Sequence, residues 1–383
     1  MESKIERYST EALIRSMSNI NTVLSSFKLS YKDEKVNEKS DTTPPHLRDD
    51  AQEKIAAIIN SIIYNEDGTE ANFLPTNRYI KNLLQKYVSQ VEQYSTIENE
   101  TFLEIMMEYQ FRTTEGGDIP NPCASCHVSF EIPQCGDEQI VSDNLVGTRV
   151  FPQHNDVGVR KLWEAGACLT EYLIRNPELV DGKAIVELGA GVGTTGIIVA
   201  GLCKTKSMHM TDYTDATLLN MIHNVAINQE WTKRVRESLN VEEENEQPVT
   251  TGYLEWEQFA DGEFDSQSHI MPKETIDQDV ETSLALARQA QVLIAADCVY
   301  DRAFIPALVQ SVAKLLSNEE KCAIFATTFR NAETFAIFEK ELQRADVKCE
   351  YVARKDIDNL PYIFPCYDDQ PRSDVRICIM RKK

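Results

Sequence analysis

Hydrophobic residues in the first third of the chain recur at the spacing of helices. Isoleucines 55, 58, 59 and 62 repeat at three- and four-residue intervals, which places them on one helix face. The same periodicity predicts three further helices, over about residues 10–27, 80–91 and 102–109. The polar segment 31–50 predicts a loop, and residues 113–150, rich in Gly, Pro and Asn, predict irregular structure with a short hairpin. This part of the chain is therefore expected to be mainly helical.

From Val159 onward, short apolar runs alternate with amphipathic segments. The runs, bounded by turn residues, predict strands, and the amphipathic segments predict helices. Predicted strands lie at 183–188, up to 213, at 249–256, 292–297, 322–328, 349–355 and 375–380. Predicted helices lie at 159–175, from 194, at 216–228, 305–316 and 332–345.

This alternation predicts an α/β fold with a doubly wound, seven-stranded, mostly parallel sheet. No helix is predicted between the last two strands, which indicates an antiparallel edge hairpin. We expect an N-terminal helical region over 1–145 and a second domain over 146–383. Ligands of such sheets bind at the carboxyl ends of the strands, near the point where strand order reverses. Residues that directly follow strands are therefore the candidates for function.

Composition indicates the cellular compartment in which the protein is expected. No run of about 18 apolar residues exists, which argues against a transmembrane helix. The first seven residues lack the apolar segment of a secretory signal. The ten cysteines show no framework spacing, which favours free thiols in a reducing compartment. We therefore expect a cytoplasmic, monomeric protein without a membrane partner.

The net charge of −22 argues against direct binding to nucleic acid, which needs a basic surface. Segment 237–281 holds fourteen acidic residues and one lysine. One interpretation is a solvated surface insertion. The other is an acidic rim that attracts a basic substrate over long distances.

A glycine-rich turn follows the strand at 183–188. Gly189, Gly191, Gly193 and Gly196 allow a sharp backbone bend and close approach of a ligand. Glu187 ends this strand, and Asp212 ends the next, where a carboxylate can accept hydrogen bonds from ribose hydroxyls. The turn predicts a nucleotide-type cofactor. By itself it leaves a methyl donor and a dinucleotide open.

The strand at 292–297 ends in a carboxylate, and an aromatic hydroxyl follows three residues later. Asp297 could orient a substrate amine by accepting its hydrogen bond, and Tyr300 could form a wall of the pocket. Hydride transfer would instead need a proton donor for an alcohol, and no Tyr/Lys or His arrangement of that kind is recognisable. The structural alternative for Asp297 is the N-cap of the following helix.

Cys123, Cys126 and His127 have the spacing of a haem attachment site. Covalent haem attachment needs an export route, which this N-terminus does not indicate. A zinc site with Cys135 as a further ligand is a second interpretation, because two cysteines at this spacing are half of a typical site. Free thiols in a loop are favoured, and no metal site is predicted.

Taken in order, the motifs resemble those of the seven-β-strand S-adenosylmethionine-dependent methyltransferases, with a Rossmann-like fold. Asp297-Cys-Val-Tyr300 is similar to the Asp-x-x-Tyr hallmark of family 16, whose members mostly methylate lysines in proteins. Segments 172–177 and 329–334, with Phe364-Pro365, resemble the branch that methylates eukaryotic elongation factor 2. The resemblance spans about Val159 to Met380.

The resemblance also implies roles for single residues. Glu187, Gly189, Gly191 and Gly193 would cradle the methionine end of the cofactor, and Asp212 its ribose. The adenine would lie between Glu255 and Trp256, while Trp163 and Ala296 would also contact the cofactor. Asp297 and Tyr300 would face the incoming lysine.

The resemblance thus implies methyl transfer from S-adenosylmethionine to a lysine of a protein, with elongation factor 2 or a related translational protein as the partner. Three alternatives remain. The acceptor could be a small molecule or another protein group, such as an amino terminus or histidine. The protein could be a non-catalytic assembly factor that retains the cofactor fold. An NAD-dependent oxidoreductase is the third.

Overall fold

The computed structural model describes residues 8–18, 20–31, 43–65, 67–71, 73–97, 99–112, 123–132, 144–241, 249–261, 280–365 and 372–383. The chain divides into two compact units. The N-terminal unit comprises residues 1–131 and 150–154, and the C-terminal unit comprises 132–149 and 155–383. Our sequence-based boundary at residues 145 and 146 stays a prediction.

The N-terminal unit is helical and has its own hydrophobic core. Its helices are α2 (Thr10–Arg15), α3 (Ile20–Leu29), η1 (Pro45–Leu47), α4 (Asp49–Ile63), α5 (Asn77–Val91) and α6 (Glu100–Phe111). Ile55, Ile59 and Ile62 on α4 are fully buried, as the isoleucine spacing predicted. They pack in one cluster with Tyr87 and Phe102, which come from α5 and α6.

The first predicted helix is in fact two. Met17 has a left-handed backbone with φ of 50°. The N–H of Ser18 then bonds back to the carbonyl of Leu13 at 3.0 Å, which closes the end of α2. The prediction of one helix over residues 10–27 was wrong because apolar periodicity continues across this turn. Within residues 113–150, predicted to be irregular with a short hairpin, two strands form, β1 (Cys126–Glu131) and β2 (Leu145–Val150).

The C-terminal unit contains a seven-stranded sheet with the order β5-β4-β3-β6-β7-β9-β8. Its strands are β3 (Ala184–Leu188), β4 (Ser207–Asp212), β5 (Val249–Tyr253), β6 (Val292–Ala296), β7 (Cys322–Thr328), β8 (Val347–Tyr351) and β9 (Val375–Lys382). Neighbours from β5 to β7 are parallel, and β9 pairs antiparallel with both β7 and β8. The doubly wound, seven-stranded sheet with its antiparallel edge is confirmed.

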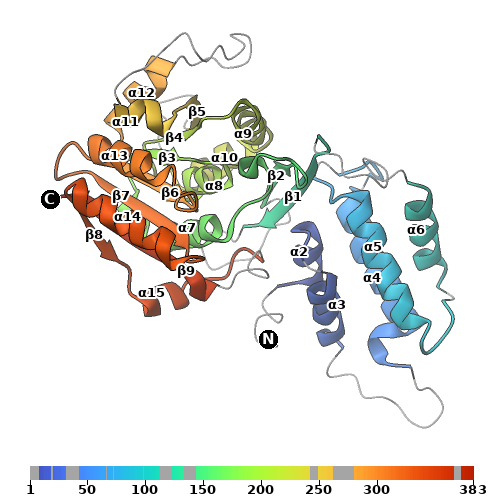
Figure 1. Ribbon diagram of the computed structural model, residues 1–383. Helices are drawn as coiled ribbons and strands as arrows, with labels where there is room; N and C mark the ends of the chain where they lie inside the picture. The colour runs from blue at the N-terminus through green and yellow to red at the C-terminus, as the bar shows by residue number, and fades with distance from the viewer. Residues whose placement is uncertain are drawn as a thin grey trace. The chain divides into compact units, whose positions relative to one another are not determined.

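Helices cover both faces of this sheet (Figure 1). They are η2 (Val157–Val159), α7 (Glu164–Arg175), η3 (Pro177–Leu179), α8 (Thr194–Leu202), α9 (Asp215–Ile227), α10 (Gln229–Ser238), α11 (Trp256–Asp261), α12 (Val280–Gln289), α13 (Ile305–Leu315), α14 (Ala332–Arg344), α15 (Arg354–Asp358) and η4 (Arg372–Asp374). Leu188, Leu293 and Phe325 form a core with α12, α13 and α14. The short helices α15 and η4 lie between β8 and β9, where the sequence predicted none.

Two buried side chains fix the segment before β9. Arg372 and Glu171 are 1% and 0% exposed, and they form an ion pair of 2.5 Å. Glu171 also accepts hydrogen bonds from the backbone N–H groups of Ile363 and Phe364, at 2.8 and 3.2 Å. These bonds satisfy the buried carboxylate and hold residues 360–365 against α7.

No helix in the described part of the chain is long and apolar enough to span a membrane.

Candidate active site

The glycine turn between β3 and α8 is shaped by backbone geometry. Gly189, Gly191 and Gly193 have φ of 63°, 57° and 77°, in the left-handed region that favours glycine. A Cβ on Gly189 would lie 2.8 Å from the sulfur of Cys298, and one on Gly191 would lie 3.0 Å from the carbonyl oxygen of Gly158. The turn therefore requires glycine for its conformation and for close packing.

A cavity of about 780 Å³ opens at the carboxyl ends of β3, β4 and β6. The chain continues from β3 to β4 and β5 on one side and returns to β6 on the other, so strand order reverses here. The predicted site residues that line the cavity are Trp163, Glu187, Gly189, Gly191, Asp212, Glu255, Trp256, Ala296, Asp297 and Tyr300.

Gly193 is the one predicted site residue that does not line the cavity. It is the N-cap of α8, and a Cβ there would lie 3.0 Å from Met221 and 3.3 Å from Met210. These contacts give Gly193 a role in packing α8 under the turn. Its predicted contact with the cofactor stays a prediction.

Two buried carboxyl groups lie on one side of the cavity. Asp212 accepts hydrogen bonds from the N–H groups of Gly191 and Tyr213, at 3.0 and 2.8 Å. Burial raises the pKa of Asp212 to about 6 and that of Glu187 to about 8. By geometry, the Oε2 atom of Glu187 has no hydrogen-bond partner among the described residues, although the backbone N–H of Gly196 is near enough to oppose the rise of its pKa. A buried acceptor without a partner that borders a cavity fits a donor group on a ligand.

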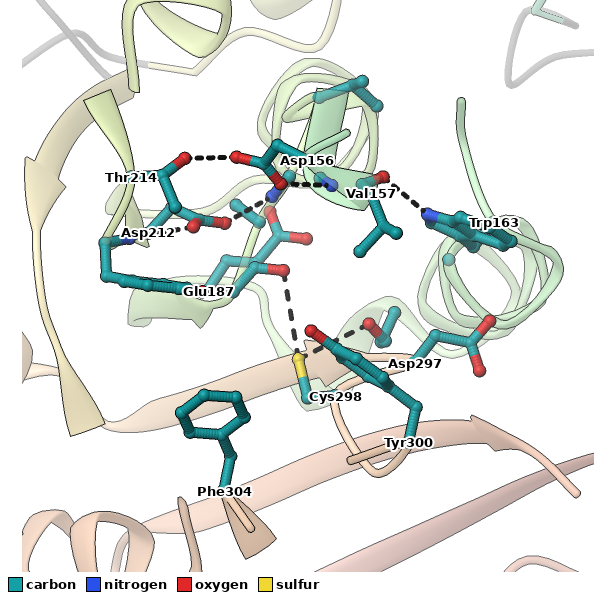
Figure 2. A pocket seen from close by; sticks show the side chains of 18 of the residues that line it. Asp156, Val157, Trp163, Glu187, Asp212, Thr214, Asp297, Cys298, Tyr300 and Phe304 are labelled. Atoms are coloured by element: carbon teal, nitrogen blue, oxygen red, sulfur yellow. Dashed lines mark hydrogen bonds between the residues drawn. The ribbon is translucent and has the colours of Figure 1, made fainter. Parts of the chain in front are cut away.

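A loop over residues 155–163 forms another wall of the cavity. Asp156 accepts hydrogen bonds from the N–H of Gly158 at 2.8 Å, from the hydroxyl of Thr217 at 2.9 Å, and from the hydroxyl of Thr214. The indole N–H of Trp163 donates to the carbonyl of Val157 at 3.3 Å (Figure 2). These bonds hold the loop over the glycine turn.

This loop corrects one sequence-based expectation. A helix was predicted from Val159, but η2 ends there and α7 begins only at Glu164. Asp156 bonds to the N–H two residues later, which is an Asx turn and competes with helix formation. That Asp-x-Gly pattern was a sequence signal that the prediction did not use.

Glu255 and Trp256 follow β5 at the far edge of the site. Glu255 accepts hydrogen bonds from the hydroxyl of Tyr253 at 2.5 Å and from the side chain of Gln258. The Trp256 ring packs against the glycine turn. A Cβ added to Gly189 would lie 3.0 Å from this ring. Both residues border the cavity, and the contact with adenine that the family resemblance implied for them stays a prediction.

Asp297 directly follows β6 and has φ of 51°, unusual outside glycine. Asp297 is not the N-cap of the following helix, because α13 begins at Ile305 and its N-cap is Phe304. Oδ1 accepts from the N–H of Thr328 at 2.9 Å, and Oδ2 accepts from the Thr328 hydroxyl at 3.0 Å. Strained backbone conformations of this kind concentrate at functional sites.

Arg330 completes the surroundings of Asp297. Its two terminal nitrogens donate to Oδ1 and Oδ2 of Asp297, at 3.2 and 3.3 Å. With the two bonds from Thr328 and a longer one of 3.5 Å from the N–H of Ala165, five donors already serve this carboxylate. A substrate amine could therefore bond to Asp297 only if one of them opened. Sequence reasoning gave Arg330 no role, although it lies in the segment 329–334 that resembled one branch of the family. That resemblance was the signal that could have identified it, because the local sequence does not show that its side chain reaches the end of β6.

Aromatic side chains surround the opening of the cavity. Tyr300 and Tyr213 are 51% and 49% exposed, and the rings of Tyr213 and Phe304 lie 6.5 Å apart. Burial raises the pKa of Tyr300 to about 12, so its hydroxyl stays protonated at neutral pH. In Figure 2, the ring of Tyr300 and the carboxylate of Asp297 lie on the side of the cavity opposite Asp212.

The cysteine motif lies at the start of β1. Cys123 is exposed and Cys126 is buried. Among the described residues, no three His, Cys, Asp or Glu side chains are placed to hold a metal ion. Cys135, the third ligand of the zinc interpretation, lies outside the described residues.

The chain matches known proteins over most of its C-terminal unit. A family model described as lysine methyltransferase matches residues 151–267 and 265–344, just over half of the chain. The chain is 25% identical to the mouse protein-lysine N-methyltransferase EEF2KMT over 281 residues, 73% of this chain and 72% of the mouse protein. It is 28% identical to human EEF2KMT over 206 residues, which cover 52% of this chain and 54% of the human protein.

A third relative and a solved structure extend the comparison. The Schizosaccharomyces pombe protein N-terminal and lysine N-methyltransferase efm7 is 36% identical over 107 residues, 28% of this chain and 38% of that protein. A TehB-like SAM-dependent methyltransferase from Corynebacterium glutamicum superposes with a TM-score of 0.31 and 10% identity, covering 56% of this chain and 88% of that chain.

The cavity fits a cationic nucleoside cofactor. Six acidic and two basic residues line it, and even with Glu187 protonated at neutral pH the acidic residues outnumber the basic ones, which suits the positive charge of a sulfonium. Glu187 offers a buried acceptor without a partner, and the Cβ-free turn admits a ligand close to the backbone. The resemblance seen in the sequence motifs is confirmed by the family match. The chain therefore belongs to the lysine methyltransferase family, and S-adenosylmethionine is its methyl donor.

Proposed function

We propose that this protein transfers a methyl group from S-adenosylmethionine to a lysine side chain of elongation factor 2, in the cytoplasm. The observation that carries the proposal is the cavity, which joins a cofactor end at Glu187 and Asp212 to an aromatic opening at Tyr213 and Tyr300. The relatives named EEF2KMT support the substrate, since they match more than half of the chain.

Each end of the cavity has a distinct task. Glu187, Asp212, Glu255 and the glycine turn would hold the cofactor, which supplies a methyl group already activated for displacement. The chain's remaining tasks are to align the amine and to exclude water from it, because alignment alone removes a large part of such barriers. Tyr300 and Asp297 border the acceptor end, where the lysine would enter.

The direct test incubates the purified protein with labelled S-adenosylmethionine and purified elongation factor 2, followed by mass spectrometry of the product. We expect label on a lysine of that protein. Label only on other proteins would reject the substrate. Label on an amino terminus, a histidine or a small molecule would reject the lysine acceptor, and efm7 makes the amino terminus the first alternative to examine.

A substitution at Asp297 tests whether this residue acts on the acceptor lysine or on the cofactor. Asp297→Asn keeps the shape of the side chain but removes the charge that Arg330 contacts. We expect methyl transfer to fall by roughly 100-fold, the usual loss when one electrostatic group of a site is removed. Adenosylhomocysteine binding, measured by calorimetry, should change less than about threefold. A comparable loss of binding would place Asp297 at the cofactor end instead.

A further inference from the structure

Four charged side chains gather beside Trp163, at the edge of the cavity. This charge cluster consists of Lys161, Glu164, Asp297 and Arg330. They come from three segments: the start of α7 with the loop before it, the end of β6, and the loop after β7. The two carboxylates are buried, with side chains 1% exposed in Glu164 and 6% in Asp297. Buried charges are costly unless they are paired.

The cluster pairs each carboxylate with a cation. Arg330 contacts both oxygens of Asp297, at 3.2 and 3.3 Å, and reaches Glu164 at 3.5 Å. The Nζ atom of Lys161 lies 2.8 Å from Glu164. Lys161 and Arg330 also lie 4.8 and 5.7 Å from the centre of the Trp163 ring. Two negative and two positive charges leave the cluster formally neutral.

Neutrality matters because only an uncharged amine can attack a methyl group. A free lysine has a pKa near 10.4, so at pH 7 almost all of it is protonated. A bare carboxylate beside the amine would favour the ammonium form, whereas a nearby cation opposes it. Arg330 is suited to this task, because a guanidinium does not lose its proton and binds a carboxylate through two parallel bonds.

We propose that Arg330 is a positioning residue that neutralises Asp297, so that the substrate lysine is bound as its uncharged, nucleophilic amine. This inference rests on the proposed function, since it requires a lysine acceptor. All five donors on Asp297 stay in place, so the proton of the lysine leaves to solvent. The lone pair of the lysine nitrogen then forms the bond to the methyl carbon, while the carbon–sulfur bond breaks and its electron pair stays on sulfur.

The other titratable groups around the cluster do not replace Arg330. Burial raises the pKa of Cys298 and of Tyr300, so both stay neutral at physiological pH. Glu187 and Asp212 face the cavity from β3 and β4, and they carry negative rather than positive charge when ionised. Two further charged groups are engaged elsewhere: Arg302 pairs with Glu333 at 2.8 Å, and Arg376 lies over the Phe329 ring.

The test compares the pH dependence of kcat/KM for Arg330→Gln and Arg330→Lys with the unaltered protein, between pH 6 and 10. Arg330→Gln should move the rise in kcat/KM to higher pH by about one pH unit, the lower end of the effect of a close charge. Its rate should therefore be about tenfold lower near pH 7.5 and recover at high pH. Arg330→Lys keeps the charge and should keep the profile.

Matched controls separate this effect from a structural one. Arg344→Gln removes an arginine that is 59% exposed and paired with Glu341, and it should change nothing. Adenosylhomocysteine affinity should stay within about twofold in every variant. If Arg330→Gln does not fold, Arg330→Met, which keeps an apolar stem over Trp163, is measured in the same way.

Two results would overturn the inference: a pH profile of Arg330→Gln that matches the unaltered protein, or one lowered equally at every pH. The second result would leave Arg330 with a structural role only. If the unaltered protein transfers no methyl group to lysine at any pH, the proposed function itself fails, and the two failures are thus distinguishable.

Discussion

Single residues define the shape of the cofactor end of the cavity. Gly191 combines a left-handed backbone with an approach to the carbonyl oxygen of Gly158, which leaves no room for a side chain. Glu187 and Asp212 are buried acids whose pKa is raised by that burial. Each of these features lies at the end of a strand or in the turn that follows it, so local sequence was enough to locate it.

We expect Gly191→Ala to weaken adenosylhomocysteine binding at least tenfold by calorimetry. The alanine must adopt φ near 57° and would bring its Cβ to 3.0 Å from a backbone oxygen, which must then move. Strain of this kind costs about 1–3 kcal/mol. Gly182→Ala is the matched control, because Gly182 has φ of 69° but nothing within 4 Å of its Cβ position. If both variants lost the same affinity for adenosylhomocysteine, backbone strain and not the contact with Gly158 would explain the loss.

At the scale of elements, strands and helices are tied together by polar side chains that the apolar pattern does not reveal. His209 on β4 bonds to Thr250 on β5 and to Ser283 on α12, each at 2.9 Å. Asp156 ties the loop 155–163 to Thr214 and Thr217 at the start of α9. Such ties fix how neighbouring elements meet beneath and around the cavity.

Burial lowers the pKa of His209 from 6.5 to about 4. The folded protein keeps this side chain neutral, while the unfolded chain takes up a proton as pH falls below 6.5. The free energy of unfolding should therefore fall between pH 6.5 and 4, by up to about 3 kcal/mol from this residue. Urea unfolding at several pH values measures this slope.

The histidine's contribution is isolated by comparing variants. His209→Gln should remove that part of the pH slope, although it costs stability at pH 8 through the lost hydrogen bonds. His154→Gln, at a less buried histidine, should retain the slope. An unchanged slope in His209→Gln would assign the pH dependence to other groups.

At the scale of the whole molecule, the two units have separate cores. All described residues that line the cavity belong to the C-terminal unit. Small-molecule chemistry would not need the helical unit, so we predict that it contributes to the recognition of a large protein substrate. The acidic segment 237–281 could add to that recognition, but residues 242–248 and 262–279 lie outside the described part of the chain.

Deletion of residues 1–110 should lower methyl transfer to intact elongation factor 2 by at least about tenfold. Transfer to a short lysine peptide and the affinity for adenosylhomocysteine should stay within about twofold, because the cavity and its core are retained. Filter-binding assays with labelled cofactor measure both transfers. Full activity on the intact substrate would reject a docking role for the helices.

The sequence determined the features that depend on neighbours along the chain. Apolar periodicity predicted most helices and all seven strands of the sheet, and the left-handed glycines marked the turn between β3 and α8. The carboxyl ends of parallel strands meet at one edge, so Glu187, Asp212 and Asp297 were predicted together. These inferences needed only local conformational preferences and one rule of topology.

Only the tertiary structure decided which side chains meet from distant segments. Arg330 reaches Asp297 from a neighbouring strand end, and Asp156 reaches Thr214 across 58 residues. Such pairs depend on the length and direction of side chains after the sheet has formed, so no periodicity encodes them. The glycine turn could therefore be predicted from the sequence, whereas the charge balance around the acceptor lysine could not.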